Sequence, residues 1–259
     1  MNFETLLFTV EDNVALIKIN RPEAGNAINP AMAKDFFKAS LICDSDPEIR
    51  AVVITGQGKL FSGGGDLNYF AQEPNLRKAL LEMTTYLHGA ISRFSRMAAP
   101  TIAAVNGTAG GGGFSLMCSC DLAIAAENAK FAMAYTAAGL TPDGSSTYFL
   151  PRLIGQRRAN ELTLTNRRLS AQEALDWGLI NQVVPADELM PTAISLAKKL
   201  AQGSATTYGK AMELMRKSFD NSLETQMEGE AQAISEIANS NNAREGIRAF
   251  LEKRKPKFE

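Results

Sequence analysis

Apolar positions in the first part of the chain switch between the spacing of strands and the spacing of helices. Four short apolar runs have the pattern of buried strands: 14–19, 51–55, 101–105 and 122–126. Helical spacing begins after Asn29-Pro30, where Asn29 is a suitable cap, and recurs over 76–97. Strands that alternate with helices predict an α/β core.

The pattern changes beyond residue 168. From Ala171 onward the apolar positions follow helical spacing almost throughout, with expected helices at 189–201, 207–219 and 223–239. We therefore expect a core with the candidate site over 1–168 and a helical region over 169–259. A helical appendage without a strong core of its own must bury its apolar face elsewhere, so this region is expected to pack against other subunits.

Composition and charge exclude several classes of function. Of 259 residues, 45% are hydrophobic and 21% are charged, and the net charge is −1. This balance creates no general field that would attract nucleic acid or an anionic membrane. No apolar run reaches the ~20 residues of a membrane-spanning helix. We expect neither nucleic acid nor a membrane among the partners.

Cysteine and histidine usage points to a reducing compartment without a metal site. The three cysteines form no disulfide framework, and His88 is the only histidine. The acidic N-terminus lacks the basic-then-apolar order of a signal peptide. We expect a cytoplasmic protein with no bound metal.

Two glycine clusters carry the strongest chemical signal. Gly63-Gly64-Gly65 follows the second strand, and 107–113 follows the third. Glycine lets bare backbone amides approach a ligand. The second cluster also begins a helix, whose free amides and dipole favour negative charge. Taken alone, either cluster is better explained as a tight turn. The functional alternative is an anion or oxyanion site, which requires free backbone amides of this kind.

The two clusters belong to a longer pattern. F-x-G-G-G-D-L begins at Phe61, and P-x-I-A-A-V-N-G-x-A-x-G-G-G begins at Pro100. With A-x-x-W-G-L-I from Ala174, this pattern resembles the crotonase (enoyl-CoA hydratase/isomerase) superfamily over nearly the whole chain. The resemblance implies an α/β spiral of ββα units, a C-terminal helical trimerisation region, and a homotrimer or dimer of trimers.

The resemblance also implies a role for the glycines. In the family two backbone amides bind the thioester oxygen of an acyl-CoA, and the matching residues are Gly65 and Gly112. Loss of one such donor typically costs ~3–4 kcal/mol of barrier. The coenzyme A thioester is the substrate, and no separate cofactor is implied. Further matched substrate-binding positions are Ala24, Ser62, Gly63, Asp66, Leu67 and Gly111.

The two glutamates that hydratases of this family use are missing. Ser115 and Tyr135 stand at their positions, and neither is a carboxylate base. Ser115 can bond a ligand, although packing under the helix is the favoured interpretation. Tyr135 is expected to be a pocket wall, because the ordinary tyrosine pKa is near ~10.

Asp143 is the nearest remaining carboxylate. From the residues alone it is a turn or cap residue in the stretch T-P-D-G-S-S. The resemblance gives it an acid/base role, because one Δ3,Δ2-enoyl-CoA isomerase branch and the 1,2-epoxyphenylacetyl-CoA isomerases place their carboxylate there. Nearby Phe131, Tyr135 and Tyr148 are expected to desolvate Asp143 and raise its pKa, as a base near neutral pH requires.

A rival resemblance involves the only histidine. The 4-chlorobenzoyl-CoA dehalogenases have a nucleophilic aspartate at the position of Asp143 and a catalytic histidine at that of His88. Tyr135 replaces the tryptophan that those enzymes place beside the aspartate. His88 is equally well explained as a packed or solvated residue on a helix face.

The basic C-terminus has two interpretations. Lys253 and the lysines after it can form a solvated tail. The resemblance implies instead that Phe250 and Lys253 border the coenzyme A of a neighbouring subunit, where lysine suits phosphate.

These observations favour an acyl-CoA isomerase. It would stabilise a thioester enolate and shift a proton with Asp143, in double-bond or ring isomerisation. The alternatives are a hydratase with a rearranged site, a dehalogenase-like hydrolase, and a non-catalytic acyl-CoA-binding member, against which Asp143 argues. The sequence leaves open the acyl group, its length, and the choice between trimer and hexamer.

Overall fold

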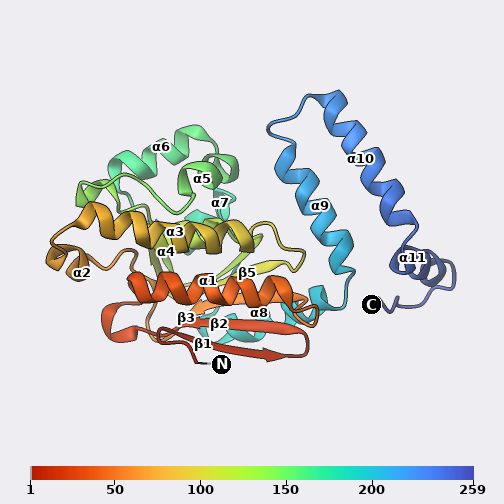
Figure 1. Ribbon diagram of the computed structural model, residues 1–259, viewed down its shortest axis with the longest axis horizontal. Coiled ribbons are helices and arrows are strands. Elements are labelled where there is room, and N and C mark those ends of the chain that lie inside the picture. Colours follow the sequence, from red (N-terminus) through yellow and green to blue (C-terminus); the bar gives the residue numbers. More distant parts are fainter. Residues whose placement is uncertain (1) are drawn as a thin grey trace.

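The computed structural model describes residues 2–259 (Figure 1). Its strands are β1 (Leu6–Glu11), β2 (Val14–Ile19), β3 (Ala51–Gly56), β4 (Leu60–Ser62), β5 (Thr101–Val105), β6 (Thr108–Gly110), β7 (Leu122–Ala126), β8 (Lys130–Ala132), β9 (Leu169–Ser170) and β10 (Gln182–Val184). Its α-helices are α1 (Pro30–Ser45), α2 (Leu67–Gln72), α3 (Leu76–Phe94), α4 (Gly111–Cys118), α5 (Ser146–Ile154), α6 (Gln156–Thr165), α7 (Ala171–Asp176), α8 (Leu189–Ala201), α9 (Ala205–Lys217), α10 (Leu223–Ala238) and α11 (Asn241–Leu251). Short 3-10 helices are η1 (Pro22–Ala24), η2 (Thr136–Ala138) and η3 (Ala186–Glu188).

The strands form two sheets, and from β3 to β8 consecutive strands alternate between them. One sheet has six strands in the order β1-β2-β3-β5-β7-β10, and the other has four in the order β4-β6-β8-β9. Thus β3, β5 and β7 each pass to the second sheet as β4, β6 and β8, and helical structure follows each pair. The chain therefore advances as a spiral of ββα units, which confirms the expected fold class.

The central strands of the large sheet are buried on both faces, because successive residues of a strand point to opposite sides and each side packs against helices. In β3, Val52 and Ile54 join the core shared with α1, α3 and α4, whereas Ala51 and Val53 face α8. On α8, alanines four residues apart present a flat surface to the strands. Strands buried on both faces read as continuous apolar runs, which is why these strands could be predicted.

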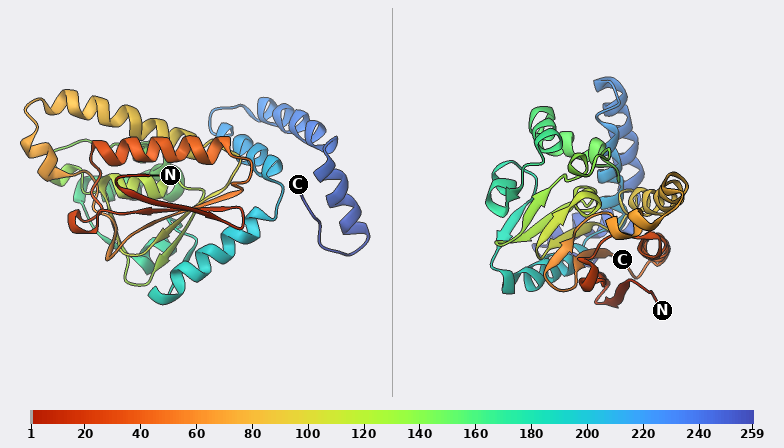
Figure 2. Two further views of the ribbon diagram at one scale, coloured as in Figure 1. Left: turned by 60° about the horizontal axis from the view of Figure 1, so that its bottom comes forward. Right: turned by 90° about the vertical axis from the view of Figure 1, so that its left-hand side faces the viewer.

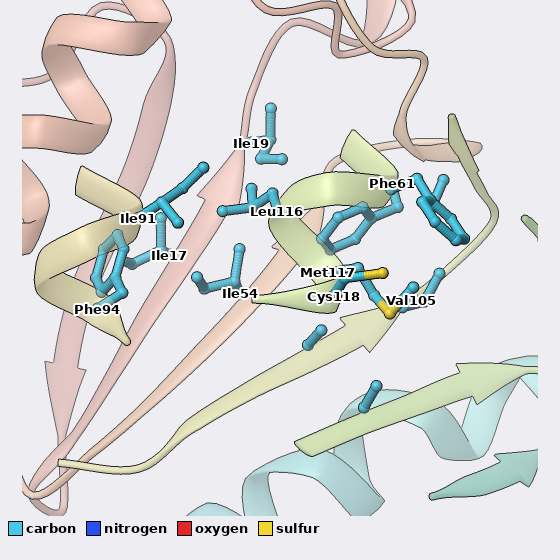
Figure 3. Packing of buried hydrophobic residues seen from close by; sticks show 14 of the residues in the cluster. Ile17, Ile19, Ile54, Phe61, Ile91, Phe94, Val105, Leu116, Met117 and Cys118 are labelled. Carbon is cyan, nitrogen blue, oxygen red and sulfur yellow. The ribbon is translucent and has the colours of Figure 1, made fainter. Parts of the chain in front are cut away.

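Helix α4 lies in the interior, and all eight of its residues are buried. A helix with apolar residues on all its faces is typically buried in this way. Figure 3 shows Leu116 and Met117 among Ile54 and Phe61 from neighbouring strands. A Cβ at Gly113 would lie 2.5 Å from Ser62 Cβ, so only glycine lets this helix approach β4 so closely.

The expected start of the helical region at 169 is too early. Strand β9 pairs with β8, strand β10 pairs with β7, and α8 covers the large sheet, so residues 169–201 complete the core. The sequence did not indicate these strands because two or three residues are too few to show a strand period.

Only the last three helices extend away from the core (Figures 1 and 2). These helices and the turn between α9 and α10 expose large apolar side chains: Met215, Phe219, Leu223, Met227, Ile234, Ile247, Phe250 and Leu251. Within residues 2–259, no helix combines the length and the apolar character needed to cross a membrane.

Candidate active site

The peptide of Gly65 is held so that its N–H points away from its partner strand. Ile28 N–H donates to the Gly64 carbonyl (2.7 Å), and Asp66 N–H donates to the Ile28 carbonyl (3.0 Å). Gly65 thus forms a parallel bridge with Ile28. In this pattern the middle residue turns its own N–H and C=O to the opposite side. The Gly65 amide is therefore left for a ligand.

Gly112 supplies a second amide next to the first. It is the second residue of α4, and the first four N–H groups of a helix have no partner within the helix. A Cβ at position 112 would lie 3.9 Å from the Gly65 nitrogen and 2.9 Å from Ile28 Cδ1. The two residues are thus adjacent, and their amides can reach one ligand atom. This arrangement can bind an oxyanion.

A cavity of about 390 Å³ opens onto these amides. Seven of the predicted site residues line it: Gly63, Gly65, Leu67, Gly111, Gly112, Tyr135 and Asp143. Helix α3 adds an apolar wall with Leu80, Leu81, Met83 and Leu87. The cavity can therefore hold an apolar group whose polar end lies at the glycines.

Asp143 lies between this cavity and a second one. Its Oδ1 is 2.8 Å from Nε2 of His88 on α3. His88 lines a cleft of about 1190 Å³ bordered by α3, α5 and α9, and Asp143 lines that cleft as well. Asp143 is thus accessible both from the cavity beside the glycines and from the outer cleft.

The contact with His88 shifts both pKa values toward the charged forms. The hydrogen bond to Asp143 raises the pKa of His88, against a smaller opposing effect of burial. Burial acts to raise the pKa of Asp143, but hydrogen bonds from His88 and the Gly144 N–H, together with the His88 charge, lower it. The expected rise in the pKa of Asp143 is therefore wrong, because the two hydrogen bonds and the His88 charge together outweigh desolvation. Asp143 is ionised at neutral pH.

Ser115 and Tyr135 hold the backbone of Asp143. Ser115 Oγ is 2.8 Å from the Asp143 carbonyl oxygen and 2.8 Å from the Tyr135 hydroxyl, which is itself 3.1 Å from that carbonyl. Ser115 is fully buried, in agreement with packing rather than ligand contact. Burial raises the pKa of Tyr135, so its hydroxyl stays protonated.

The other predicted residues lie outside the cavity lining. Ser62 is buried and donates to the Asn26 carbonyl (2.8 Å), and Asp66 pairs with Arg21. Ala24 ends η1 on the loop that contacts the first glycine cluster.

Phe250 lies in the last turn of α11 and Lys253 follows that helix, and neither residue lines the cavity within one chain. Their predicted contact with coenzyme A in a neighbouring subunit remains a prediction.

The apolar wall of α3 and the pairing of Arg21 with Asp66 were not predicted from the sequence. The apolar face of α3 could have been predicted, because Leu80, Met83 and Leu87 follow helical spacing in the sequence. The ion pair joins residues 45 positions apart, and no local pattern indicates it. No group of three or more potential metal ligands is present in the part of the chain that the structure describes.

Comparison with known proteins decides the family. The family model described as enoyl-CoA hydratase/isomerase matches residues 9–259. The chain belongs to the enoyl-CoA hydratase/isomerase family. An enoyl-CoA hydratase from Polaromonas sp. JS666 has the same fold, with a TM-score of 0.93, 34% identity and coverage of 98% of this chain and 99% of that one.

Relatives within the family have names for different reactions. The 1,2-epoxyphenylacetyl-CoA isomerase of Escherichia coli is 36% identical over 98% of both chains. A 4-chlorobenzoyl coenzyme A dehalogenase of Arthrobacter is 34% identical over 86% of this chain and 82% of its own. Several further relatives are named as hydratases. Family membership therefore indicates an enzyme acting on acyl-CoA without selecting the reaction.

Proposed function

We propose that this chain is an acyl-CoA isomerase, with a coenzyme A thioester as substrate and no separate cofactor. One observation carries the proposal. Within residues 2–259, Asp143 is the single carboxylate that lines the cavity onto which the Gly65 and Gly112 amides open. A site with two oxyanion donors and one base suits reactions that pass through an enolate.

The proton shift needs only that base. The Asp143 carboxylate takes a proton from carbon 2 of a 3-enoyl-CoA, and the electron pair delocalises onto the thioester oxygen. Gly65 and Gly112 donate hydrogen bonds to this oxygen as its negative charge develops. Asp143 then returns the proton to carbon 4, which gives the 2-enoyl-CoA. The apolar wall of α3 holds the acyl chain, and ring isomerisation would use the same base and donors.

Hydration requires more positioned acid and base groups than isomerisation does. Water must lose a proton while it attacks carbon 3, and carbon 2 must gain one. Ser115 and Tyr135 stand where hydratases of the family have glutamates, and both hydroxyls already contact the Asp143 backbone. Each positioned acid or base typically contributes ~10²–10⁴-fold, so hydration is expected to be the slower reaction.

The contact between His88 and Asp143 favours a second candidate, hydrolytic dehalogenation. In that reaction the carboxylate would attack a chlorinated ring carbon and expel chloride, leaving an aryl ester. Formation of the ester would remove the carboxylate charge that favours protonated His88, so His88 would release its proton to solvent and then take one from a water molecule in the outer cleft. That water would hydrolyse the ester at the carboxyl carbon, which releases the phenol and restores the Asp143 carboxylate. The distance of 2.8 Å between Nε2 and Oδ1 places the proposed base directly beside the proposed nucleophile.

We also infer that the enzyme is a homotrimer or a dimer of trimers. The support is the row of exposed apolar side chains on α9, α10 and α11, whose burial in an assembly would be favourable. The three free cysteines fit a reducing cytoplasm, where we infer that the enzyme works.

A substrate panel tests the proposed reaction. Wild type, Asp143→Asn and the surface control Asp44→Asn would be incubated with 3-enoyl-, 2-enoyl- and 4-chlorobenzoyl-CoA, and products identified by mass spectrometry. We expect isomerisation of 3-enoyl-CoA to exceed hydration of 2-enoyl-CoA by at least ~100-fold. Asp143→Asn should abolish isomerisation and keep acyl-CoA binding, whereas Asp44→Asn should behave as wild type.

Rapid hydration by the wild type, or an active Asp143→Asn variant, would overturn the isomerase proposal. Chloride release that depends on both Asp143 and His88 would establish the second candidate. Binding without any exchange of the carbon-2 proton would indicate a non-catalytic acyl-CoA-binding protein.

A further inference from the structure

An ion pair lies directly beside the proposed oxyanion hole. Arg21 Nη1 is 3.0 Å from Asp66 Oδ2, and the two side chains are only 18% and 11% exposed. Asp66 immediately follows Gly65 in the chain. We propose that Arg21 is a positioning residue, which orients the Gly65 amide and neutralises the Asp66 carboxylate. This inference rests on the proposed function of Gly65.

Arg21 connects the two segments that fix the Gly65 peptide. The same Nη1 donates to the Ala27 carbonyl (2.5 Å) as well as to Asp66. Ala27 precedes Ile28, whose N–H and carbonyl bond the peptides on both sides of Gly65. The guanidinium therefore joins the Ile28 segment to the end of the glycine cluster. Loss of it would release both segments and let the Gly65 N–H turn.

The backbone of Arg21 is itself fixed, which makes it a firm anchor. Its N–H donates to Asn26 Oδ1 (3.0 Å), and Asn26 Nδ2 donates to the Leu60 carbonyl (2.8 Å). Asn26 is fully buried. The anchor thus extends to the strand that precedes the glycine cluster.

The charge of Arg21 has a second effect. Asp66 Oδ1 accepts the Tyr69 N–H (3.1 Å) and so caps α2, while Oδ2 faces Arg21. Without Arg21 a largely buried carboxylate would lie one residue from the amide that must stabilise a developing negative charge. Charges interact strongly where water is excluded, so this carboxylate would oppose formation of the enolate. Arg21 neutralises the charge of the Asp66 carboxylate and so favours formation of the enolate.

The test measures polarisation of a bound thioester. Saturated butyryl-CoA, labelled with ¹³C at the carbonyl carbon, would be bound to wild type, Arg21→Met, Asp66→Asn and the double variant. The ¹³C shift reports hydrogen bonding to the thioester oxygen, and deuterium uptake at carbon 2 reports enolate formation. Arg93→Met, which breaks the distant ion pair with Asp44, is the matched control.

We expect Arg21→Met to lose most of the ¹³C shift and to slow deuterium uptake by ~10–100-fold, within the range for loss of an oxyanion donor. Its affinity for butyryl-CoA should change less than threefold. The double variant should exchange deuterium faster than Arg21→Met but slower than wild type, because the asparagine side chain that Asp66→Asn introduces still caps α2 and carries no charge, whereas the contact with Ala27 stays lost. Arg93→Met should match wild type.

The result that overturns the inference is a folded Arg21→Met variant with the wild-type shift and exchange rate, or a double variant no faster than Arg21→Met. Arg21→Gln replaces Arg21→Met if the latter does not fold, since it keeps a donor for Ala27 without charge. Wild type that shows neither shift nor exchange would overturn the proposed function itself, and this inference with it.

Discussion

Asp143 and His88 form a pair whose charge state controls the proposed chemistry. The raised pKa of His88 and the lowered pKa of Asp143 mean that both are charged in the interval between those two values. Any stability from this half-exposed pair is present there, lost below as Asp143 gains a proton and lost above as His88 releases one. For an exposed pair such stability is small, at most ~1 kcal/mol. The catalytic consequence is larger, because isomerisation requires the carboxylate.

We predict that His88→Gln moves the acid limb of the kcat/KM profile for isomerisation to higher pH. Glutamine can donate a hydrogen bond to Asp143 but carries no charge, so the pKa of Asp143 should rise toward its ordinary value. The measurement is the pH dependence of isomerisation for wild type and variant, with His88→Asn as a shorter control. An acid limb that stays in place would mean that the pair does not set the protonation of Asp143.

Helix α4 and the strands before it determine where the second amide lies. We predict that Gly112→Pro lowers turnover at least ~100-fold, because proline removes this N–H. At this position the N–H has no partner inside the helix, so the helix itself loses no hydrogen bond.

Gly112→Ala is the matched control for that substitution. It keeps the N–H, and the atom nearest its Cβ is the terminal Cδ1 of the flexible Ile28 side chain at 2.9 Å, whereas the Gly65 nitrogen and the Tyr135 hydroxyl oxygen lie at 3.9 Å, an ordinary contact distance. Its loss of turnover should therefore be much smaller than that of Gly112→Pro. Near-normal turnover of folded Gly112→Pro would remove Gly112 from the oxyanion hole.

Most of the long elements could be predicted from the sequence, although β1, α5 and α6 were missed, and the shortest strands could not. The strand expected at 14–19 and the cap at Asn29 occur as predicted, and the helix expected over 76–97 ends at Phe94. Strands β4, β6 and β8 have three residues each and were missed, because so few positions show no period.

The same limit applies to the site. The glycine motifs pointed to Gly65 and Gly112, whereas the contact between His88 and Asp143 spans 55 positions and follows only from the fold. The direction of the Asp143 pKa shift was mispredicted for this reason, since its cause lies on another element.

For the whole molecule, we predict a trimer or hexamer held through 202–259. Light scattering at micromolar concentration should give three or six times the mass of one chain. Phe250, 84% exposed in the single chain, is expected to reach the coenzyme A of a neighbouring subunit. Phe250→Ala should weaken acyl-CoA affinity in a titration and leave the fold intact. A monomeric mass, or unchanged affinity in the variant, would argue against this arrangement.

The proposed oxyanion hole consists entirely of main chain. A peptide N–H is encoded at every position except proline, so most mutations near Gly65 and Gly112 cannot delete it. It also has no proton to gain or lose over the working pH range. Substitutions can therefore redesign the side chains around the thioester while enolate stabilisation persists. One scaffold can in this way diversify among reactions, as the hydratases, isomerase and dehalogenase among its relatives have done.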